Sequence, residues 1–295
     1  MKRNSFIASH LYVISLAVAA TMSVGFVNVT PKVIYGEDGR REIYEVEQAA
    51  IRDLADSTVA LIPIRNILAR AGGTFEIKAG TMESEMRVCP SEPYSQQPAA
   101  AMCSGSLVGP DLVATAGHCV NSSDCSKYAF VFGYRMNTSS SANMSVAGSD
   151  VYSCKEIVAH EYTGKQDYAL VRLDRAVIGH RVLPIDTTPV QPGDEVYVVG
   201  HPSGLPTKVT LGGKVRSQES GYFVTNLDTY GGNSGSAVFS AASNAIVGIL
   251  VRGEADFVNG RENGKMCRVS NVCKEDACRG EDVTNISYIS KALNQ

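Results

Sequence analysis

Two short segments carry most of the information in this chain: Cys103-Ser104-Gly105-Ser106-Leu107-Val108 and Ala114-Thr115-Ala116-Gly117-His118-Cys119. Both are apolar runs typical of β-strands, and the second ends on a histidine between a glycine and a cysteine. A single histidine at the end of a strand is more often structural than catalytic. The significance of His118 therefore depends on what the rest of the chain supplies.

Two further segments supply an aspartate and a serine: Gln166-Asp167-Tyr168-Ala169-Leu170 and Gly231-Gly232-Asn233-Ser234-Gly235-Ser236. A serine hydroxyl is a weak nucleophile, so an imidazole must accept its proton and a carboxylate must hold that imidazole in one tautomer. Glycines around the serine let the backbone turn tightly enough to aim two N–H groups at an oxyanion. Each residue alone has an ordinary structural explanation, but the set in the order His, Asp, Ser predicts nucleophilic catalysis.

Short β-like runs recur along the chain between turn residues, a spacing typical of a sandwich or barrel. We expect strands over residues 58–62, 74–78, 106–115, 129–133, 156–160, 168–173, 196–200, 207–211, 222–226, 236–240 and 245–251. Residues 45–56 are expected to form one or two helical turns. Residues 137–149 and 253–281 are expected to be long loops, and residues 177–192 divide the two sets of strands.

These motifs resemble those of the chymotrypsin-like (trypsin-fold) serine peptidases, from about residue 58 to the C-terminus. The resemblance implies an all-β fold of two six-stranded antiparallel barrels packed around a catalytic cleft, with a short C-terminal helix. The peptidase domain would then span residues 57–295. Its first barrel would cover about residues 57–176 and its second about 177–295.

The same resemblance assigns roles to individual residues. Ser234 would be the nucleophile, His118 the general base and acid, and Asp167 the group that orients the imidazole. The N–H groups of Gly232 and Ser234 would form the oxyanion hole. Asn233 replaces the aspartate that animal digestive members use to bind a new N-terminus, so activation by that ion pair is not expected.

Other features are more similar to the bacterial glutamyl-endopeptidase-like branch of the family. These are the Gly-Gly-Asn-Ser-Gly-Ser string, the early stretch over residues 33–40, and Gly200-His201-Pro202-Ser203-Gly204. We interpret this last segment as a loop between strands and His201 as structural. The branch's usual pocket histidine would fall near Leu250, and it is missing.

The family pattern places the base of the S1 pocket six residues before the nucleophile, at Asp228, next to Thr229. Gly253 and Glu281 would lie on the pocket wall. A carboxylate buried at a pocket base is costly alone, and a substrate Lys or Arg offsets that cost, which predicts cleavage after basic P1 residues. Arg252 leaves an alternative open, because it could neutralise Asp228 or recognise an acidic P1 residue.

The chain has eight cysteines, an unusual number for a reducing cytosol. The resemblance implies a disulfide between Cys103 and Cys119, which would contribute about 3 kcal/mol by closing a short loop around His118. Cys125 and Cys154 are the preferred second pair, since both lie in the first-barrel region. Cys89 would then join the C-terminal trio Cys267, Cys273 and Cys278. The alternative, a metal site at that trio, lacks the C-x2-C spacing of structural zinc sites.

The N-terminus predicts export. Lys2 and Arg3 precede the apolar run 11–18, and a small-x-small cleavage pattern follows at residues 17–19. We expect residues 1–19 to be a signal peptide, with an uncleaved anchor as the alternative, and residues 20–56 to be an N-terminal extension or propeptide. An enzyme that cuts after basic residues could process itself at Lys32–Val33.

Composition narrows the class of function. The formal net charge is -3, from 27 basic and 30 acidic residues, so no basic excess favours nucleic-acid binding. We predict a secreted or periplasmic serine endopeptidase that acts on polypeptides through an acyl-enzyme on Ser234, without metal or cofactor, and without stable membrane association after signal cleavage. The oligomeric state is not indicated. The alternatives are a glutamyl-type specificity, an inactive homologue that serves as a binding module, and an esterase, although the Gly-x-Ser-x-Gly elbow is absent.

Overall fold

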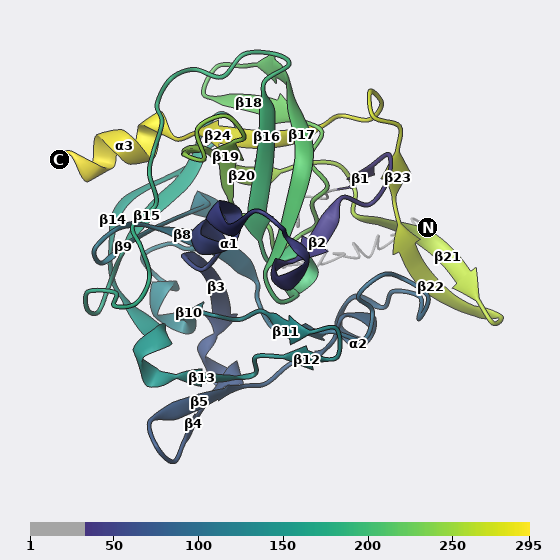
Figure 1. Ribbon diagram of the computed structural model, residues 1–295, viewed down its shortest axis with the longest axis horizontal. Coiled ribbons are helices and arrows are strands. Elements are labelled where there is room, and N and C mark those ends of the chain that lie inside the picture. Colours follow the sequence, from purple (N-terminus) through teal and green to yellow (C-terminus); the bar gives the residue numbers. More distant parts are fainter. Residues whose placement is uncertain (1–32) are drawn as a thin grey trace, which may run out of the picture.

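The computed structural model describes residues 33–295 (Figure 1). The predicted signal peptide and the first part of the predicted extension lie outside these residues. Across the described part of the chain, no helix combines the length and apolarity needed to cross a membrane. Most of the chain is built into two barrels that lie against each other, one above the other in Figure 1.

The first barrel is closed and antiparallel, with strand order β10-β14-β15-β9-β8-β3. Its strands are β3 (Thr58–Pro63), β8 (Cys103–Gly109), β9 (Leu112–Thr115), β10 (Tyr128–Phe132), β14 (Val151–Tyr162) and β15 (Asp167–Leu173). The expected single strand over 106–115 is two strands, because Pro110 and Asp111 turn the chain between β8 and β9. Every residue of β3 is buried, which accounts for its continuous apolar character.

The second barrel has the order β16-β19-β20-β24-β18-β17 and is closed by pairing of β16 with β17. Its strands are β16 (Glu195–Gly200), β17 (Lys208–Gln218), β18 (Tyr222–Thr225), β19 (Ala237–Ser240), β20 (Ile246–Arg252) and β24 (Glu281–Asn285). Helix α3 (Ser287–Leu293) follows β24 near the C-terminus. The predicted fold, two six-stranded barrels and a short C-terminal helix, is therefore confirmed.

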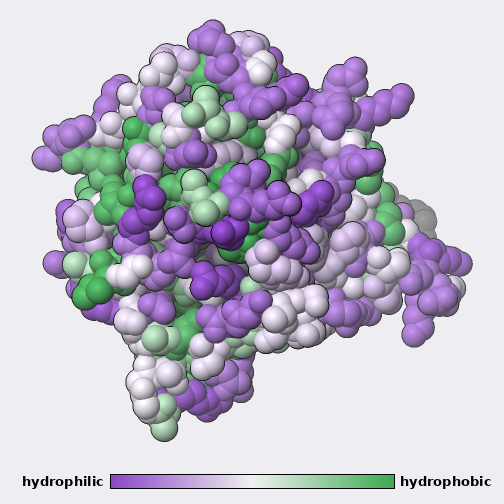
Figure 2. Space-filling model, viewed as in Figure 1, coloured by the Kyte–Doolittle hydropathy of each residue, from purple (hydrophilic) through white to green (hydrophobic). Residues whose placement is uncertain are grey.

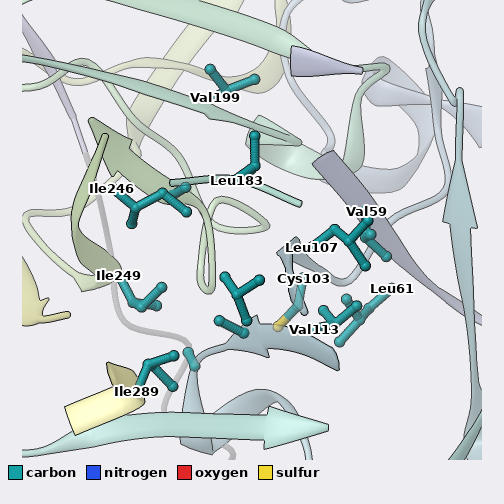
Figure 3. Close-up of a cluster of buried hydrophobic side chains, with 14 of the residues drawn as sticks. Val59, Leu61, Cys103, Leu107, Val113, Leu183, Val199, Ile246, Ile249 and Ile289 are labelled. Carbon is teal, nitrogen blue, oxygen red and sulfur yellow. The ribbon is translucent and has the colours of Figure 1, made fainter. Parts of the chain in front are cut away.

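One apolar cluster joins the barrels (Figure 3). It includes Leu61 and Leu107 from the first barrel and Val199 and Ile249 from the second, all at most 1% exposed. Ile289 of α3 packs into the same cluster. Because the two barrels share this core, the loops at their interface are held in fixed relative positions, as a site built from both barrels requires.

Residues 33–56 pack into the barrels, although the predicted domain boundary falls at residue 57. Strand β2 (Arg40–Glu42) pairs with β17 as a seventh strand of the second sheet, and β1 (Ile34–Tyr35) pairs with β23 (Val272–Cys273). Helix α1 (Ala49–Ala55) contributes Leu54 to the main core. The segment before residue 57 thus packs as part of the same folded unit as the two barrels.

The remaining strands are short and lie outside the barrels. They are β4 (Ile67–Arg70), β5 (Thr74–Ile77), β6 (Gly80–Thr81), β7 (Pro98–Ala99), β11 (Met136–Thr138), β12 (Ser141–Ala142), β13 (Ser145–Ala147), β21 (Phe257–Glu262) and β22 (Lys265–Ser270), with helix α2 (Met82–Met86) after β6. The expected loop over 253–281 contains the β21–β22 hairpin, which projects from the right edge in Figure 1 with a largely hydrophilic surface in Figure 2. Residues 137–149, also expected to be a loop, contain β12 and β13.

The eight cysteines form four disulfides. Cys103 pairs with Cys119 and Cys125 with Cys154, both as expected. Cys89 pairs with Cys267 of the C-terminal trio, and the other two form Cys273–Cys278. The alternative metal site is therefore not available, because its three sulfurs are all oxidised in pairs.

Candidate active site

His118 and Asp167 are held together at one end of the first barrel. His118 lies in a single 3₁₀ turn (Gly117–Cys119) after β9, and Asp167 is the first residue of the adjacent strand β15. The His118 Nδ1 lies 2.7 Å from Asp167 Oδ2, and the His118 backbone N–H donates to Asp167 Oδ1 at 3.0 Å. The carboxylate is 1% exposed and so fixes both the ring and the backbone of His118.

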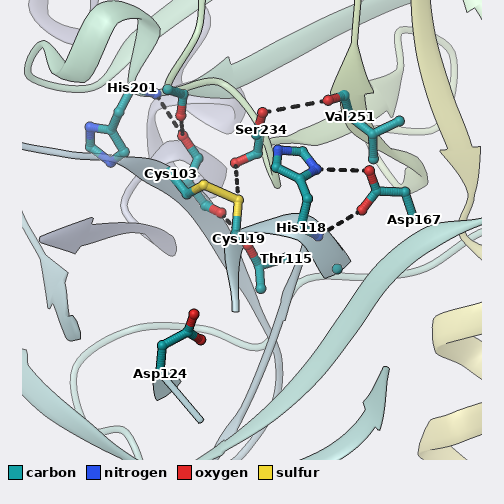
Figure 4. Close-up of a disulfide and its surroundings, with 12 residues drawn as sticks. Cys103, Thr115, His118, Cys119, Asp124, Asp167, His201, Ser234 and Val251 are labelled. Carbon is teal, nitrogen blue, oxygen red and sulfur yellow. Dashed lines mark hydrogen bonds and ion pairs between the residues drawn. A yellow bond between two sulfur atoms is a disulfide. The ribbon is translucent and has the colours of Figure 1, made fainter. Parts of the chain in front are cut away.

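Ser234 comes from the second barrel, in the loop before β19. Figure 4 shows the His118 imidazole between the Asp167 carboxylate and the Ser234 side chain. The Ser234 hydroxyl donates to the Val251 carbonyl at 3.5 Å, which is a long hydrogen bond. The structure thus brings together the three residues that the motifs predicted.

The loop around Ser234 contains the two expected oxyanion donors. Gly232 and Gly235 have φ of 94° and 90°, a backbone conformation that favours glycine. A Cβ on Gly235 would lie 2.0 Å from the Ser104 carbonyl oxygen, so a larger residue cannot fit there. Among residues 33–295, the Gly232 and Ser234 N–H groups donate to no protein acceptor, which leaves both available to an oxyanion.

Three of the predicted S1 residues lie together. The Thr229 hydroxyl donates to Glu281 Oε2 at 2.5 Å, and a Cβ on Gly253 would lie 2.0 Å from the same oxygen. The Glu254 N–H donates to Glu281 Oε1 at 3.2 Å. Glu281 is fully buried at the start of β24, and its carboxyl group lies against Gly253 and Glu254, directly after the end of the adjacent strand β20.

Asp228 has different partners from those expected of a pocket base. Its two carboxylate oxygens accept from the backbone N–H groups of Tyr35 at 2.6 Å and Gly39 at 2.7 Å. Burial raises the pKa of Asp228 to about 6, against the lowering effect of these two hydrogen bonds. Asp228 therefore anchors the N-terminal segment, a role that the S1 prediction did not anticipate.

Arg252 does not contact Asp228. Its Nε donates to Asp282 at 2.8 Å and its Nη2 to the Gly164 carbonyl at 2.9 Å. The guanidinium is thus tied to a buried carboxylate on β24, next to Glu281 in sequence. These contacts do not support neutralisation of Asp228 by Arg252, and recognition of an acidic P1 residue stays an alternative.

His201 is buried outside the catalytic group. Its Nδ1 lies 3.0 Å from the Leu205 carbonyl, and its ring stacks on Tyr134 at 5.6 Å between centroids. Burial lowers the pKa of His201 to about 4, so the ring is neutral at ordinary pH. This environment is compatible with the structural role predicted for the residue.

Two residues that contact the site have no role predicted from the sequence. Tyr162, at the end of β14, is 57% exposed and places its ring 5.8 Å from that of His118. Ser104, in the motif next to Cys103, contacts the Ser234 loop through both its main chain and its hydroxyl. The only signal in the sequence for Tyr162 was its position five residues before Asp167, and nothing in the sequence distinguished Ser104 from Ser106.

Comparisons with known proteins place this geometry in a family. The model of the trypsin-like peptidase domain matches residues 103–249, which hold His118, Asp167 and Ser234. No curated protein gives a significant match. Among solved structures, a Glu endopeptidase in complex with MPD is 19% identical, with a TM-score of 0.49 over 89% of this chain and 100% of that chain. A serine endoprotease from Yersinia pestis is 16% identical, with a TM-score of 0.49 over 85% and 67%. By its match to the domain model, the chain belongs to the trypsin-like serine peptidases.

Proposed function

We propose that the protein is a secreted serine endopeptidase with Ser234 as nucleophile, His118 as general base and acid, and Asp167 as orienting group. The observation that carries the proposal is the buried Asp167–His118 pair beside a serine in a tight glycine-containing loop. These are the parts that acyl transfer to a hydroxyl needs. The two uncommitted N–H groups of Gly232 and Ser234 supply the fourth requirement, an oxyanion site.

In the acylation step the Ser234 Oγ forms a bond to the substrate carbonyl carbon while its proton passes to His118 Nε2. The carbonyl oxygen becomes an oxyanion, which the N–H groups of Gly232 and Ser234 stabilise. The C–N bond then breaks, and His118 returns the proton to the leaving amine. A water molecule then attacks the acyl carbon while His118 accepts its proton; the bond from that carbon to Ser234 Oγ breaks, and His118 returns the proton to Oγ.

The proposed P1 preference is for Lys or Arg. Its support is the buried Glu281 carboxylate, in contact with the Thr229 hydroxyl and the backbone at Gly253 and Glu254. A cationic side chain compensates a buried carboxylate, whereas an acidic one would add a second negative charge at the same place. Asp228, which is bound to the N–H groups of the N-terminal segment, would add to the negative potential of the proposed pocket. The alternative is a glutamyl-type preference, which would require a cation at P1, and the Arg252 guanidinium is bound to Asp282 and Gly164.

Export is the proposed localisation, secreted or periplasmic. Its support is four disulfides in the described part of the chain, together with the signal-like sequence over residues 1–19. Polypeptides outside the cytoplasm would be the substrates.

Fluorophosphonate labelling of the purified protein tests the nucleophile. We expect one adduct on Ser234, no adduct in Ser234→Ala, and cleavage of a peptide library mainly after Lys and Arg. Absence of an adduct in correctly folded wild-type protein would instead support the binding-module alternative. A library profile dominated by Glu or Asp at P1 would support the glutamyl-type alternative.

A further inference from the structure

Ser104 is fully buried in β8, and all of its polar groups are engaged around the Ser234 loop. Its hydroxyl donates to the Gly232 carbonyl at 2.8 Å and accepts from the His201 N–H at 2.9 Å. Its own N–H donates to the Ser234 carbonyl at 2.8 Å, and its carbonyl accepts from the Thr115 hydroxyl at 2.7 Å. One residue of the first barrel thus binds the nucleophile loop of the second barrel at two points.

The polarity of these bonds is fixed by their end groups. A backbone N–H such as that of His201 can only donate, and a carbonyl such as that of Gly232 can only accept. The Ser104 hydroxyl has one proton, which must therefore point to Gly232 while a lone pair receives the N–H. No other orientation of this hydroxyl satisfies both neighbours.

The two contacted carbonyls belong to the same two residues whose N–H groups face the oxyanion. Each peptide unit is planar, so a bond to the Gly232 carbonyl fixes the plane that joins Gly232 to Asn233. This plane lies in the stretch of backbone between the two donors. Glycine at a φ of 94° has little conformational preference of its own, so outside contacts must select its geometry.

The peptide before Gly232 is held from the same side. The Ser203 N–H donates to the Gly231 carbonyl at 2.5 Å, and across a trans peptide this directs the Gly232 N–H in the opposite direction. A Cβ on Gly232 would lie 2.5 Å from the His201 carbonyl oxygen, so the two loops are in close contact. The connection between β16 and β17 therefore contacts the Gly231–Gly232 peptide directly, through Ser203, and the Gly232–Asn233 peptide indirectly, through Ser104.

We propose that Ser104 is a positioning residue of the oxyanion hole: its hydroxyl relays a hydrogen bond from the His201 N–H to the Gly232 carbonyl and so keeps the Gly232 and Ser234 N–H groups convergent. The inference rests on the proposed function and adds to it a residue that touches no substrate atom. The segment Gly200–Gly204 gains a role in catalysis through its backbone, while the His201 ring has none.

Ser104→Ala removes the relay and leaves the main-chain bonds of residue 104 in place. Complete loss of one oxyanion donor costs roughly 100- to 1000-fold in turnover, and a donor that is mis-aimed rather than removed loses less. We expect kcat to fall roughly 10- to 100-fold with KM within threefold of wild type. Ser106→Ala is the matched control. It lies two residues further along β8, is equally buried, and its hydroxyl has no hydrogen-bond partner within residues 33–295.

The decisive readout is inhibition by a peptide aldehyde, whose hemiacetal oxygen occupies the oxyanion hole. In Ser104→Ala the aldehyde Ki should rise by the same factor by which kcat/KM falls, with rates normalised to active sites counted by fluorophosphonate titration. Ser104→Thr, which keeps a hydroxyl, should recover part of the loss. A purely structural role would lower the yield of active sites and leave the per-site kcat and the aldehyde Ki unchanged.

Wild-type values of kcat and aldehyde Ki in Ser104→Ala would overturn the proposal. An equal loss in Ser106→Ala would also overturn it, because the effect would then belong to the strand. If Ser104→Ala does not fold, Ser104→Gly removes the same hydroxyl and is judged by the same two values. Failure of the wild-type protein to react with the fluorophosphonate would remove the proposed function itself, an outcome distinct from these.

Discussion

Glu281→Gln separates charge from shape in the proposed S1 pocket. The side chain keeps its size and one oxygen for the Thr229 hydroxyl, while the negative charge is lost. Glu281 is fully buried, so little solvent screens its attraction for a cationic P1 group. A hydrogen bond to a charged partner contributes roughly 1.5–3 kcal/mol, which converts to about a 10- to 150-fold loss in kcat/KM.

The assay compares fluorogenic peptides that differ only at P1, with Lys, Arg, Gln, Leu and Glu in turn. In Glu281→Gln we expect kcat/KM to fall by this factor for Lys and Arg and to stay within twofold for Gln and Leu. Glu262→Gln is the control, because it removes one negative charge from the β21–β22 hairpin, where the carboxylate contacts Ser91. It should leave the P1 profile unchanged.

Two results would refute the reasoning. An equal loss for all five substrates would mean that Glu281 supports the fold of the loop without contacting P1. If Asp228→Asn loses its selectivity for Lys and Arg while Glu281→Gln keeps it, Asp228 and not Glu281 would be the acidic residue that binds the P1 side chain. The second result would also require the N-terminal segment to release both oxygens of that carboxylate.

Three other contacts can be tested by substitution. The pKa of Asp228 is raised to about 6, so the folded state holds this proton more tightly than the unfolded state, and wild-type stability should fall by roughly 2 kcal/mol as pH rises from 4 to 7. Urea unfolding of Asp228→Asn should lack this component, and an identical pH profile would contradict it. Tyr162→Ala removes the exposed ring beside His118, against which we expect an apolar P2 side chain to pack. The variant should lower kcat/KM roughly threefold to tenfold for peptides with an apolar P2 residue but not for peptides with glycine at P2. Equal losses for both peptides would argue against contact between Tyr162 and P2. Lys208 and Glu42 form a buried ion pair at 3.0 Å, so Lys208→Met should lower the free energy of unfolding by about 3–5 kcal/mol. The double variant with Glu42→Gln should lower it by less in denaturant unfolding, and additive losses would contradict this.

The residues of the proposed catalytic group were predictable because their signals are local. His118 and Ser234 each occur in a six-residue segment whose glycines are required by close packing; at Gly235, for example, a Cβ would lie only 2.0 Å from the Ser104 carbonyl oxygen. Asp167 begins a strand with clear apolar periodicity. Short segments of this kind indicate a candidate catalytic residue whatever sequence surrounds them.

The β21–β22 hairpin was not predictable in the same way. Its first strand, Phe257–Glu262, contains Asn, Gly, Arg and Glu, residues of low strand propensity, and most of it is at least partly exposed. The hairpin is held by its own pairing and by Cys89–Cys267, a bond between residues 178 apart in sequence. Neither constraint leaves a periodic signal in the segment itself.

Asp228 shows why a motif position alone does not decide specificity. The family pattern fixes its place in the loop before Ser234, but a buried carboxylate is defined by its partners, and here they come from Tyr35 and Gly39 at the other end of the chain. Tyr35 meets both acids, since its N–H donates to Asp228 and its hydroxyl to Glu281 at 3.5 Å. The position of the N-terminal segment therefore fixes contacts of both carboxyl groups of the proposed pocket. On this reasoning, the P1 preference is a property of the second barrel together with residues 33–42, and neither part specifies it alone.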